Sequence, residues 1–405
     1  MKRIMQTRTL ILAAALCGGQ LLVTNQSLAQ TWSGCGAPTD VEWLAVASSA
    51  DGTKLAAAAN YPNWAIYISA NSGASWTRGS NIAANCIASS ADGTKLAAGN
   101  NNAIFTSSDS GASWTQTSAP KGSWLGITSS SDGTKLAAWG QQTQPPGLGI
   151  YSSMDSGNTW TLTSAPATNW NGLAASADGT MLVASVGGNG YFYTSTDSGT
   201  NWTARTNVPP IWWGALASSA DGAKLTAVTV GDGIYTSSDG GTNWTKTTAP
   251  NEDWIAIASS ADGTRIAAAV RSGFGAGAPG PLYTSMDSGA TWTSSNLPDE
   301  YWNSIAALAD GKFVACSVSI VSTSAGGFMV SDQIVTSTPH PWLRMEASHT
   351  NVTVIWPWPM DGYILQQKLG LDASWVSMQN APIVTNYQNE VTLPLLDKGF
   401  YQLVK

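Results

Sequence analysis

The chain has 405 residues, of which 43% are apolar and only 11% are charged, and its formal net charge is −7. This composition provides enough apolar material for a sizeable buried core and indicates a globular protein. The acidic balance, without a visible basic patch, excludes nucleic acid as an expected partner, because phosphate binding needs such a patch.

The first 29 residues have the pattern of an export signal. Three basic residues within the first eight positions precede an apolar stretch from Leu10 to Val23, and Ser27-Leu28-Ala29 offers small residues for cleavage. The stretch is short for a bilayer span, and Gly18-Gly19-Gln20 interrupts it. We therefore expect residues 1–29 to be removed from a secreted, periplasmic or cell-surface protein that is not integral to the membrane. Removal leaves 15 basic against 25 acidic residues, a formal charge of −10.

Residues 30–338 consist of repeats with a period of about 40 residues. One phrase, Ala-Asp-Gly-Thr-Lys-Leu in its fullest form, has its Asp at positions 51, 92, 132, 178, 221, 262 and 310, which makes seven copies. A second phrase, Ser-x-Asp-x-Gly-x-x-Trp, follows most of them, with Asn71 in place of Asp in its first copy. Its complete copies contain Asp109, Asp155, Asp197, Asp239 and Asp287, and end at Trp114, Trp160, Trp202, Trp244 and Trp292.

Each repeat predicts four strands, here called A to D. Short runs between the phrases, such as Ile255–Ser259 and Gly233–Ser237, have the length and the β-branched or aromatic content of strands. The Asp-Gly phrase turns A into B, a variable loop joins B to C, and the second phrase turns C into D, which begins at the Trp. Asp-Gly is typical of a tight hairpin turn whose two central residues have positive φ.

The residues of the second phrase are predicted to be structural. The Ser and Asp side chains can accept hydrogen bonds from backbone N–H groups of the turn, and the Gly takes a conformation that a Cβ forbids. The Trp supplies a large apolar body where one repeat meets the next. A lone carboxylate per turn falls short of the six to eight oxygens that Ca²⁺ prefers, so we expect no metal and no cofactor.

The Ser-x-Asp-x-Gly-x-x-Trp phrase resembles the Asp box of bacterial neuraminidase (BNR) or sialidase-like repeats, over residues 31 to about 332. Similar repeats occur in sialidases, xyloglucan hydrolases, sortilin-type receptors and the photosystem II assembly factor, and the chain resembles the last two more than active sialidases. The resemblance implies an all-β fold, a seven-bladed β-propeller of four-stranded blades. An open solenoid is the structural alternative.

The two ends of the repeat region carry further expectations. Thr31-Trp32, followed by Trp43, copies the pattern that begins at strand D, so we predict that the N-terminal segment supplies strand D of the last blade; residues 334–336 are the alternative. From Pro339 the repeat stops, and strand-like runs separated by Pro, Gly, Asp and Asn predict a small C-terminal β-sandwich-like module over residues 339–405. It resembles C-terminal modules of secreted bacterial proteins, which implies attachment or sorting.

The loops place a candidate binding surface on one face of the ring. The A–B and C–D turns share one face, the turn face, and the B–C and D–A loops share the other, the loop face. Long B–C loops at residues 139–149 and 270–281 lie on the loop face, where irregular loops on a rigid scaffold are common binding sites.

A further Trp recurs in the D–A loops, ten residues after each Trp of the second phrase, with Cys86 replacing it in the second blade. Either these residues form an aromatic ligand surface at the channel mouth, or they pack between blades, as residues repeated in every blade usually do. Cys35 and Cys86 fall in D–A loops of adjacent blades and are a candidate disulfide. The candidate ligand-binding residues are Trp43, Trp124, Trp170, Trp212, Trp254 and Trp302.

The sequence gives little support for catalysis. The mature chain keeps five arginines and lacks the Arg-Ile-Pro motif of sialidases, and both histidines, His340 and His349, fall outside the propeller. The loop pairs Glu252-Asp253 and Asp299-Glu300 are the candidates for a glycosidase, which needs two carboxylates. We predict no catalytic residues.

The predicted function is therefore an exported, monomeric, non-catalytic binding or scaffold propeller, whose ligand is a glycan or a protein at the loop face. Fold alone does not confer activity, and no catalytic set accompanies this one. Two alternatives remain: a diverged glycoside hydrolase of sialidase or xyloglucanase type, and an assembly factor for a membrane complex.

Overall fold

The computed structural model contains two compact units, Ala29–Thr338 and Met1–Leu28 with Pro339–Lys405. Its regular elements are strands, and the described residues include no helix long and apolar enough to cross a membrane. The structure describes residues 10–404 except 18–19, 24–30, 35, 39–40, 61–63, 143–148, 189, 273–277, 296–298, 300, 310, 323–327, 332–333, 339–343, 348–350, 358–363, 370–375, 378–382, 386–387 and 395–398.

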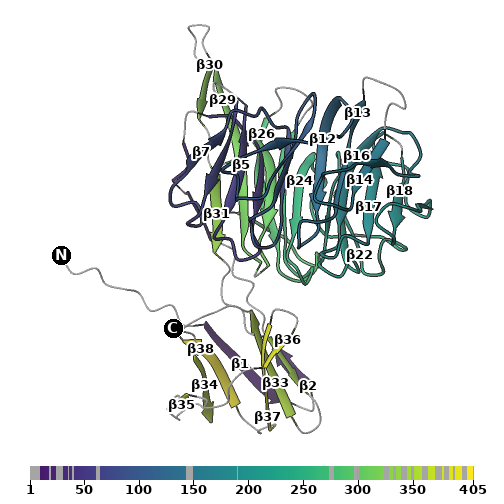
Figure 1. Cartoon of the computed structure of the whole chain (residues 1–405). Coiled ribbons are helices and arrows are strands. Elements are labelled where there is room, and N and C mark those ends of the chain that lie inside the picture. The colour runs from purple at the N-terminus through teal and green to yellow at the C-terminus, as the bar shows by residue number, and fades with distance from the viewer. Residues whose placement is uncertain are drawn as a thin grey trace, which may run out of the picture. The chain divides into compact units, whose positions relative to one another are not determined.

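The larger unit is a β-propeller (Figure 1). Six blades each consist of four consecutive antiparallel strands, and strand A of one blade contacts strand A of the next. The blades are β4 (Trp43–Ser48), β5 (Leu55–Ala59), β6 (Ala65–Ser69), β7 (Thr77–Ser80); β8 (Cys86–Ser89), β9 (Leu96–Gly99), β10 (Ile104–Ser107), β11 (Thr115–Gln116); β12 (Gly122–Ser129), β13 (Leu136–Gln142), β14 (Gly149–Ser153), β15 (Thr161–Leu162); β16 (Trp170–Ala175), β17 (Leu182–Val186), β18 (Phe192–Ser195), β19 (Thr203–Arg205); β20 (Trp213–Ser218), β21 (Leu225–Thr229), β22 (Ile234–Ser237), β23 (Thr245–Lys246); and β24 (Trp254–Ser259), β25 (Ile266–Ser272), β26 (Ala278–Ser285), β27 (Thr293–Ser294).

The structure thus has six blades of this kind rather than the predicted seven. The seventh repeat lacks the Ser-x-Asp-x-Gly phrase that turns strand C into strand D, and its sheet is composite. The order of this sheet is β28 (Tyr301–Ala307), β29 (Phe313–Ser322), β31 (Ile334–Thr338) and β3 (Thr31–Gly34), and β30 (Phe328–Ser331) pairs with the far end of β29. The outermost strand is the N-terminal segment, as predicted, with Trp32 opposite Ser337.

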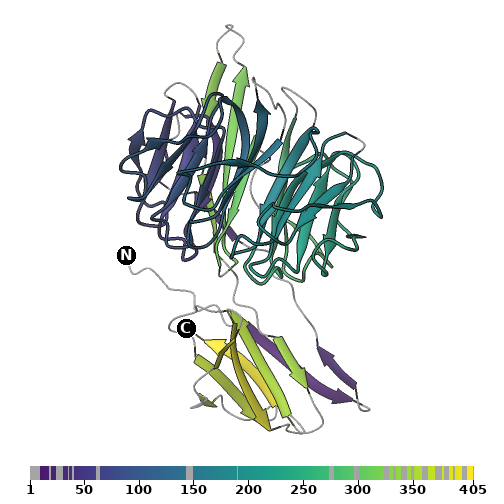
Figure 2. The same ribbon diagram turned by 45° about the vertical axis from the view of Figure 1, so that its right-hand side comes forward.

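The ring is closed between the composite sheet and the first blade, so the open solenoid is wrong. Strand β28 contacts β4, and the Ala309 N–H donates to the Ala50 carbonyl at 2.9 Å. Ala50 in turn donates to Ala91 of the second blade at 2.8 Å. In Figure 2 the purple N-terminal blades lie beside the green strands of the composite sheet, and β29 and β30 project beyond the blades.

Adjacent blades pack through small side chains on one side and large ones on the other. At the first boundary, Ala56, Ala58 and Ile66 of one blade meet Leu96 and the partly buried Trp114 of the next. Small side chains on the strands let the sheets approach closely, and the indole fills the space between them. Trp114 of the second phrase therefore packs between the first two blades.

The second phrase forms a turn held by its own side chains. In the second blade, the Gly111 N–H donates to Ser107 Oγ at 2.9 Å and the Ser113 N–H donates to Asp109 Oδ1 at 2.8 Å. Gly111 has φ +88°, and Trp114 Nε1 donates to its carbonyl at 3.1 Å. Hydrogen bonds from Ser113 and Ser107 lower the pKa of Asp109 to about 2. These contacts hold the turn together through the side chains of its own residues.

The Asp-Gly phrase forms a longer turn than the two-residue hairpin that the sequence predicts. The Ser90 N–H donates to the Lys95 carbonyl at 2.9 Å, which leaves four residues in the loop, and only Gly93 among them has positive φ. The Asp92 carboxylate holds the loop together, because it accepts hydrogen bonds from Ser90 Oγ at 2.6 Å and from the Thr94 N–H at 3.0 Å. Those two bonds lower its pKa to about 2.

A pocket of about 200 Å³ separates the turn-face ends of the first two blades, where Ala70 and Leu96 line it. The equivalent space between the third and fourth blades, where Met154 lies in place of Ala70, measures only about 10 Å³.

We expect Ala70→Met to fill part of the larger pocket and to raise the free energy of unfolding by about 0.5–1 kcal/mol. Urea denaturation measures the change, and Ala70→Ser, which adds no apolar volume, is the control; equal midpoints for both variants would contradict the assignment.

The smaller unit contains two sheets. One includes β1 and β2, which lie in the segment that the sequence predicts to be removed, and in this structure of the whole chain Leu10 of β1 pairs with Leu403 of β38. The strand order of the first sheet is β2 (Gln20–Val23), β1 (Leu10–Cys17), β38 (Gly399–Val404), β34 (Ile364–Leu369), β35 (Val376–Ser377). The strand order of the second sheet is β32 (Arg344–Ala347), β33 (Asn351–Pro357), β37 (Gln388–Pro394), β36 (Ile383–Thr385).

Candidate functional site

Five of the six candidate Trp residues of the D–A loops are almost completely buried, and the sixth, Trp212, is exposed. The five buried side chains pack within the ring, so in this structure they offer no surface to a ligand. The exposed fractions are 0% for Trp43, Trp124 and Trp302, 2% for Trp254 and 5% for Trp170.

The fifth blade departs from the predicted spacing. Trp213, which is 0% exposed, pairs with Thr229 in the way that Trp254 pairs with Val270 in the next blade, so Trp213 takes the buried position and not Trp212. One additional residue separates it from Trp202. Because successive residues of a strand point to opposite sides, the preceding Trp212 is directed elsewhere, and its side chain is 45% exposed.

In each of the six four-stranded blades except the second, the buried Trp packs against two aromatic rings of its own blade. Trp124 meets Tyr151 edge to face, with 5.5 Å between ring centroids, and lies 6.2 Å from Trp160 of the second phrase. Edge-to-face pairs add to the burial energy of such rings. The corresponding groups are Trp43, Tyr67 and Trp76; Trp170, Tyr193 and Trp202; Trp213, Tyr235 and Trp244; and Trp254, Tyr283 and Trp292.

Exposed Trp212 instead lines a pocket of about 300 Å³ on the loop face, here called the loop-face pocket. Three consecutive blades contribute to it: Leu125 and Trp139 come from the third, Asn169 and Asn171 from the fourth, and Trp212 from the fifth. Trp170, Gly140, Gly187 and Gly188 complete the lining. Its volume lies at the lower end of the range for small-molecule sites, about 300–1,000 Å³.

A β-bulge and a glycine position the residues of the third blade. The pairing of β12 with β13 shifts between Trp124 and Gly126, so Leu125 sits in the bulge, and its side chain is 40% exposed. Gly126 pairs with Trp139, and the Trp139 indole occupies the space where a Cβ of residue 126 would lie. The ring therefore rests on the neighbouring strand.

The Trp212 backbone is held from both sides. The Val230 N–H donates to the Trp212 carbonyl at 3.1 Å, and Ile211 forms a β-bridge with Gly190 of the fourth blade. Pro209-Pro210 precedes them, and proline fixes φ near −65°. The indole is thus presented by a restrained loop, which lowers the entropy lost when it binds a partner.

The fourth blade contributes two side-chain amides to the pocket and leaves space beside Gly188. Asn171 Nδ2 donates to the Trp213 carbonyl at 2.7 Å. The Asn169 side chain is exposed, and the main-chain carbonyl of Asn169 accepts from the Gly187 N–H at 2.8 Å. Gly188 has φ +73°, and no heavy atom lies within 4 Å of the position that its Cβ would take. Trp170 Nε1 is buried and has no hydrogen-bond partner within the described residues.

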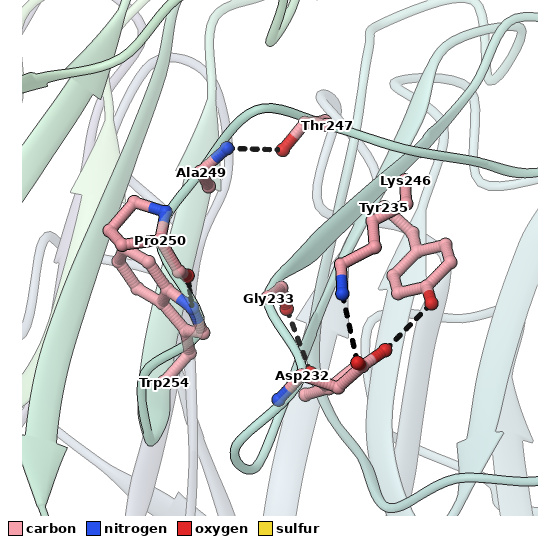
Figure 3. Close-up of polar contacts among 9 residues, drawn as sticks. Asp232, Gly233, Tyr235, Lys246, Thr247, Ala249, Pro250 and Trp254 are labelled. Carbon is pink, nitrogen blue, oxygen red and sulfur yellow. Dashed lines mark hydrogen bonds and ion pairs between the residues drawn. The ribbon is translucent and has the colours of Figure 1, made fainter.

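Among the described residues, the lining of the loop-face pocket contains no ionisable side chain. A charged group of the fifth blade is paired elsewhere: Lys246 Nζ lies 2.8 Å from Asp232 Oδ1, and the Tyr235 hydroxyl donates to Asp232 Oδ2 at 2.7 Å (Figure 3). The bonds from Lys246 and Tyr235 lower the pKa of Asp232, and burial together with Asp232 raises the pKa of Tyr235 to about 12. This pair ties the B–C loop to strands C and D.

Three of the carboxylates weighed as glycosidase candidates, Glu252, Asp253 and Asp299, are not part of the pocket lining. The Glu252 carbonyl accepts from the Gly231 N–H at 3.0 Å, and Asp253 bridges Val230, so these residues fix a loop of the fifth blade. Burial raises the pKa of Tyr283 in the sixth blade, and the charges of Glu252 and Asp299 add to that effect. Glu300 lies outside the described residues.

Cys86 is a free thiol in the structure and does not form the predicted disulfide, and Cys35 lies outside the described residues. The Cys86 Sγ is buried and lies 3.9 Å from the carbonyl oxygens of Gly99 and Trp124, and burial raises the pKa of the Cys86 thiol to about 12. The second blade has a small side chain where the other blades have an indole.

Sequence reasoning missed Leu125, Trp139, Asn169 and Asn171 as surface residues. Trp139 opens a long B–C loop, which was the one available signal. The positions of Leu125 and Asn171 depend on bulges after Trp124 and Trp170, and a bulge shifts the pairing without a signature in a single sequence.

Several solved propellers have the same fold. YCF48 bound to a D1 peptide matches with a TM-score of 0.55 and 17% identity over 81% of this chain and 100% of the matched chain. YCF48 from Cyanidioschyzon merolae matches with a TM-score of 0.56 and 14% identity, over 76% of this chain and 98% of the matched chain. The Cps50 (Swd1) propeller domain from Myceliophteria thermophila matches with a TM-score of 0.56 and 13% identity, over 77% of this chain and 100% of the matched chain. No family model and no curated protein matches the sequence. At these identities the likeness shows the fold alone.

Proposed function

We propose that the chain is an exported, non-catalytic binding or scaffold propeller of the Asp-box type, whose ligand binds in the loop-face pocket. The observation that carries the proposal is the pocket itself, with Trp212 45% exposed on a restrained loop. Partly exposed aromatic side chains in a preformed pocket are typical anchors of binding sites. Export rests on the sequence pattern of residues 1–29.

The chemistry of the lining favours binding over catalysis. Hydrolysis of a glycoside needs a pair of carboxylates beside the bond that is cleaved, and none lines this pocket. In the turn phrases, carboxylates such as Asp92 and Asp109 are engaged by hydrogen bonds of their own turns. A YCF48 structure holds a D1 peptide, which supports a binding role for a scaffold of this kind.

The test compares two exposed tryptophans. Trp212 lies in the pocket, whereas Trp64, which is 50% exposed, lies in the first blade and outside it. We expect the full chain to retain a ligand from a glycan array or from the envelope of the exporting cell, and Trp212→Ala to weaken that binding about tenfold or more, because anchor residues carry most of the binding energy. Trp64→Ala is expected to bind as the unaltered chain does.

Unchanged affinity in Trp212→Ala would refute the proposed site. Glycan hydrolysis by the full chain, abolished in Glu252→Gln or Asp299→Asn, would support the glycoside-hydrolase alternative instead. Both readouts use the same purified protein.

A further inference from the structure

We infer that the ligand of the loop-face pocket is an uncharged glycan, bound through hexose or pentose rings. The inference rests on the proposed function and specifies its ligand. It follows from three properties of the lining: the absence of ionisable groups, the pairing of partly exposed indoles with amides, and the occupation of the main-chain groups that a peptide would need.

The lining selects against charged ligands. The chain carries a formal net charge of −7, and the part of the lining that the structure describes contains neither Lys nor Arg that would hold a carboxylate, sulfate or phosphate. It also lacks Asp and Glu, which would hold a cationic ligand. A charged ligand would lose its hydration there without gaining a partner, which is costly.

The aromatic residues suit the apolar face of a sugar ring. A pyranose presents a patch of C–H groups with partial positive charge, and the face of an indole is the negative part of its quadrupole. Trp139 and Trp212 approach the pocket from the blades on either side of the fourth blade, and the backbone restraints on both keep the rings in place. The gap left by Gly188 provides room beside them.

The amides suit the hydroxyl groups that surround such a ring. A sugar hydroxyl both donates and accepts a hydrogen bond, and a carboxamide such as that of exposed Asn169 offers one acceptor oxygen and two N–H donors.

An extended peptide would find fewer partners in this pocket. Strand addition needs free main-chain groups, but the Gly187 N–H is bonded to Asn169, the Trp212 carbonyl accepts from Val230, and the Trp213 carbonyl accepts from Asn171. Charged peptide side chains and termini would find no counter-charge in the lining. The glycan therefore fits the pocket better than a protein segment.

The experiment measures binding of the full chain to three sets of immobilised probes. These are neutral oligomers of glucose, mannose, galactose and xylose; acidic uronate, sialylated and sulfated glycans; and a peptide library that includes proline-rich segments. We expect binding to one or more neutral oligomers, confirmed in solution by calorimetry. The affinity is expected to fall about tenfold or more in Trp212→Ala and severalfold in Asn169→Ala, and to stay unchanged in Trp64→Ala.

The outcomes separate this inference from the proposed function. Peptide binding that depends on Trp212 would overturn the glycan assignment and leave the binding function standing, as would Trp212-dependent binding to acidic glycans alone. Neutral glycan binding that survives Trp212→Ala would overturn both, because the ligand then lies elsewhere. Failure to bind any neutral glycan also overturns the inference. Thermal unfolding of each variant shows that the propeller is intact before binding is compared.

Discussion

Trp213→Ala is expected to lower the free energy of unfolding by about 3–5 kcal/mol, the range for deletion of a fully buried large aromatic side chain. Trp213 is 0% exposed, and its ring centroid lies 4.3 Å from that of Phe192 in the preceding blade and 5.0 Å from that of Tyr235 in its own. Its removal leaves a cavity at a blade boundary, which rigid neighbouring sheets cannot close. We expect the thermal midpoint to fall by roughly 5–10 °C.

The adjacent residue provides the control, since Trp212→Ala deletes the same atoms from the position just before β20. Because Trp212 is 45% exposed, we expect a loss of about 1 kcal/mol or less. Urea and thermal denaturation of both variants measure the difference. A larger loss of stability in Trp212→Ala than in Trp213→Ala would reverse the assignment of the two positions and remove the basis of the loop-face pocket.

Acid is expected to destabilise the propeller between about pH 4 and pH 2. Hydrogen bonds within the turns lower the pKa of Asp92, Asp132 and Asp178 to about 2, from the usual 3.8 of an aspartate. A carboxyl whose folded pKa is depressed contributes stability above its unfolded pKa and loses it as the pH falls through the folded pKa, because the unfolded state takes up the proton first. The effects of several turns add, so the urea midpoint should fall steeply below pH 4.

Asp109→Asn provides a matched control for this pH dependence. The first blade already has Asn71 at that position, where its Oδ1 accepts from the Ser75 N–H at 2.9 Å and from Ser69 Oγ at 2.9 Å. The variant should therefore keep the turn but lose one titrating group, so its stability should depend less on pH between 4 and 2 than that of the unaltered chain. Identical pH profiles for the two proteins would show that the turn carboxylate does not couple to folding.

Local chemistry was sufficient to predict the turns and strands of the six regular blades, but not the composite sheet that takes the place of a seventh. The recurring phrases fix two turns in each repeat, and between them Ala- and Ile-rich runs form strands whose bounds the structure reproduces within a residue or two, as β24 (Trp254–Ser259) shows for the predicted run Ile255–Ser259. The roles of Ser107, Asp109 and Gly111 within their turn follow from the hydrogen bonds that these residue types make over short distances. The pairing of Thr31–Gly34 at the end of the repeat was predictable because the segment copies strand D.

Only the tertiary structure decided which tryptophans are buried and where the pocket lies. A count of ten residues from Trp202 selects Trp212, whereas the pairing of β20 with β21 selects Trp213, because strand register depends on hydrogen bonds to the neighbouring strand. The loop-face pocket combines residues of three blades that lie far apart in sequence, with bulges directing Leu125 and Asn171. Thus the sequence by itself determined the repeated turns and strands, which depend on neighbours along the chain, and the ring determined the surface, which depends on neighbours in space.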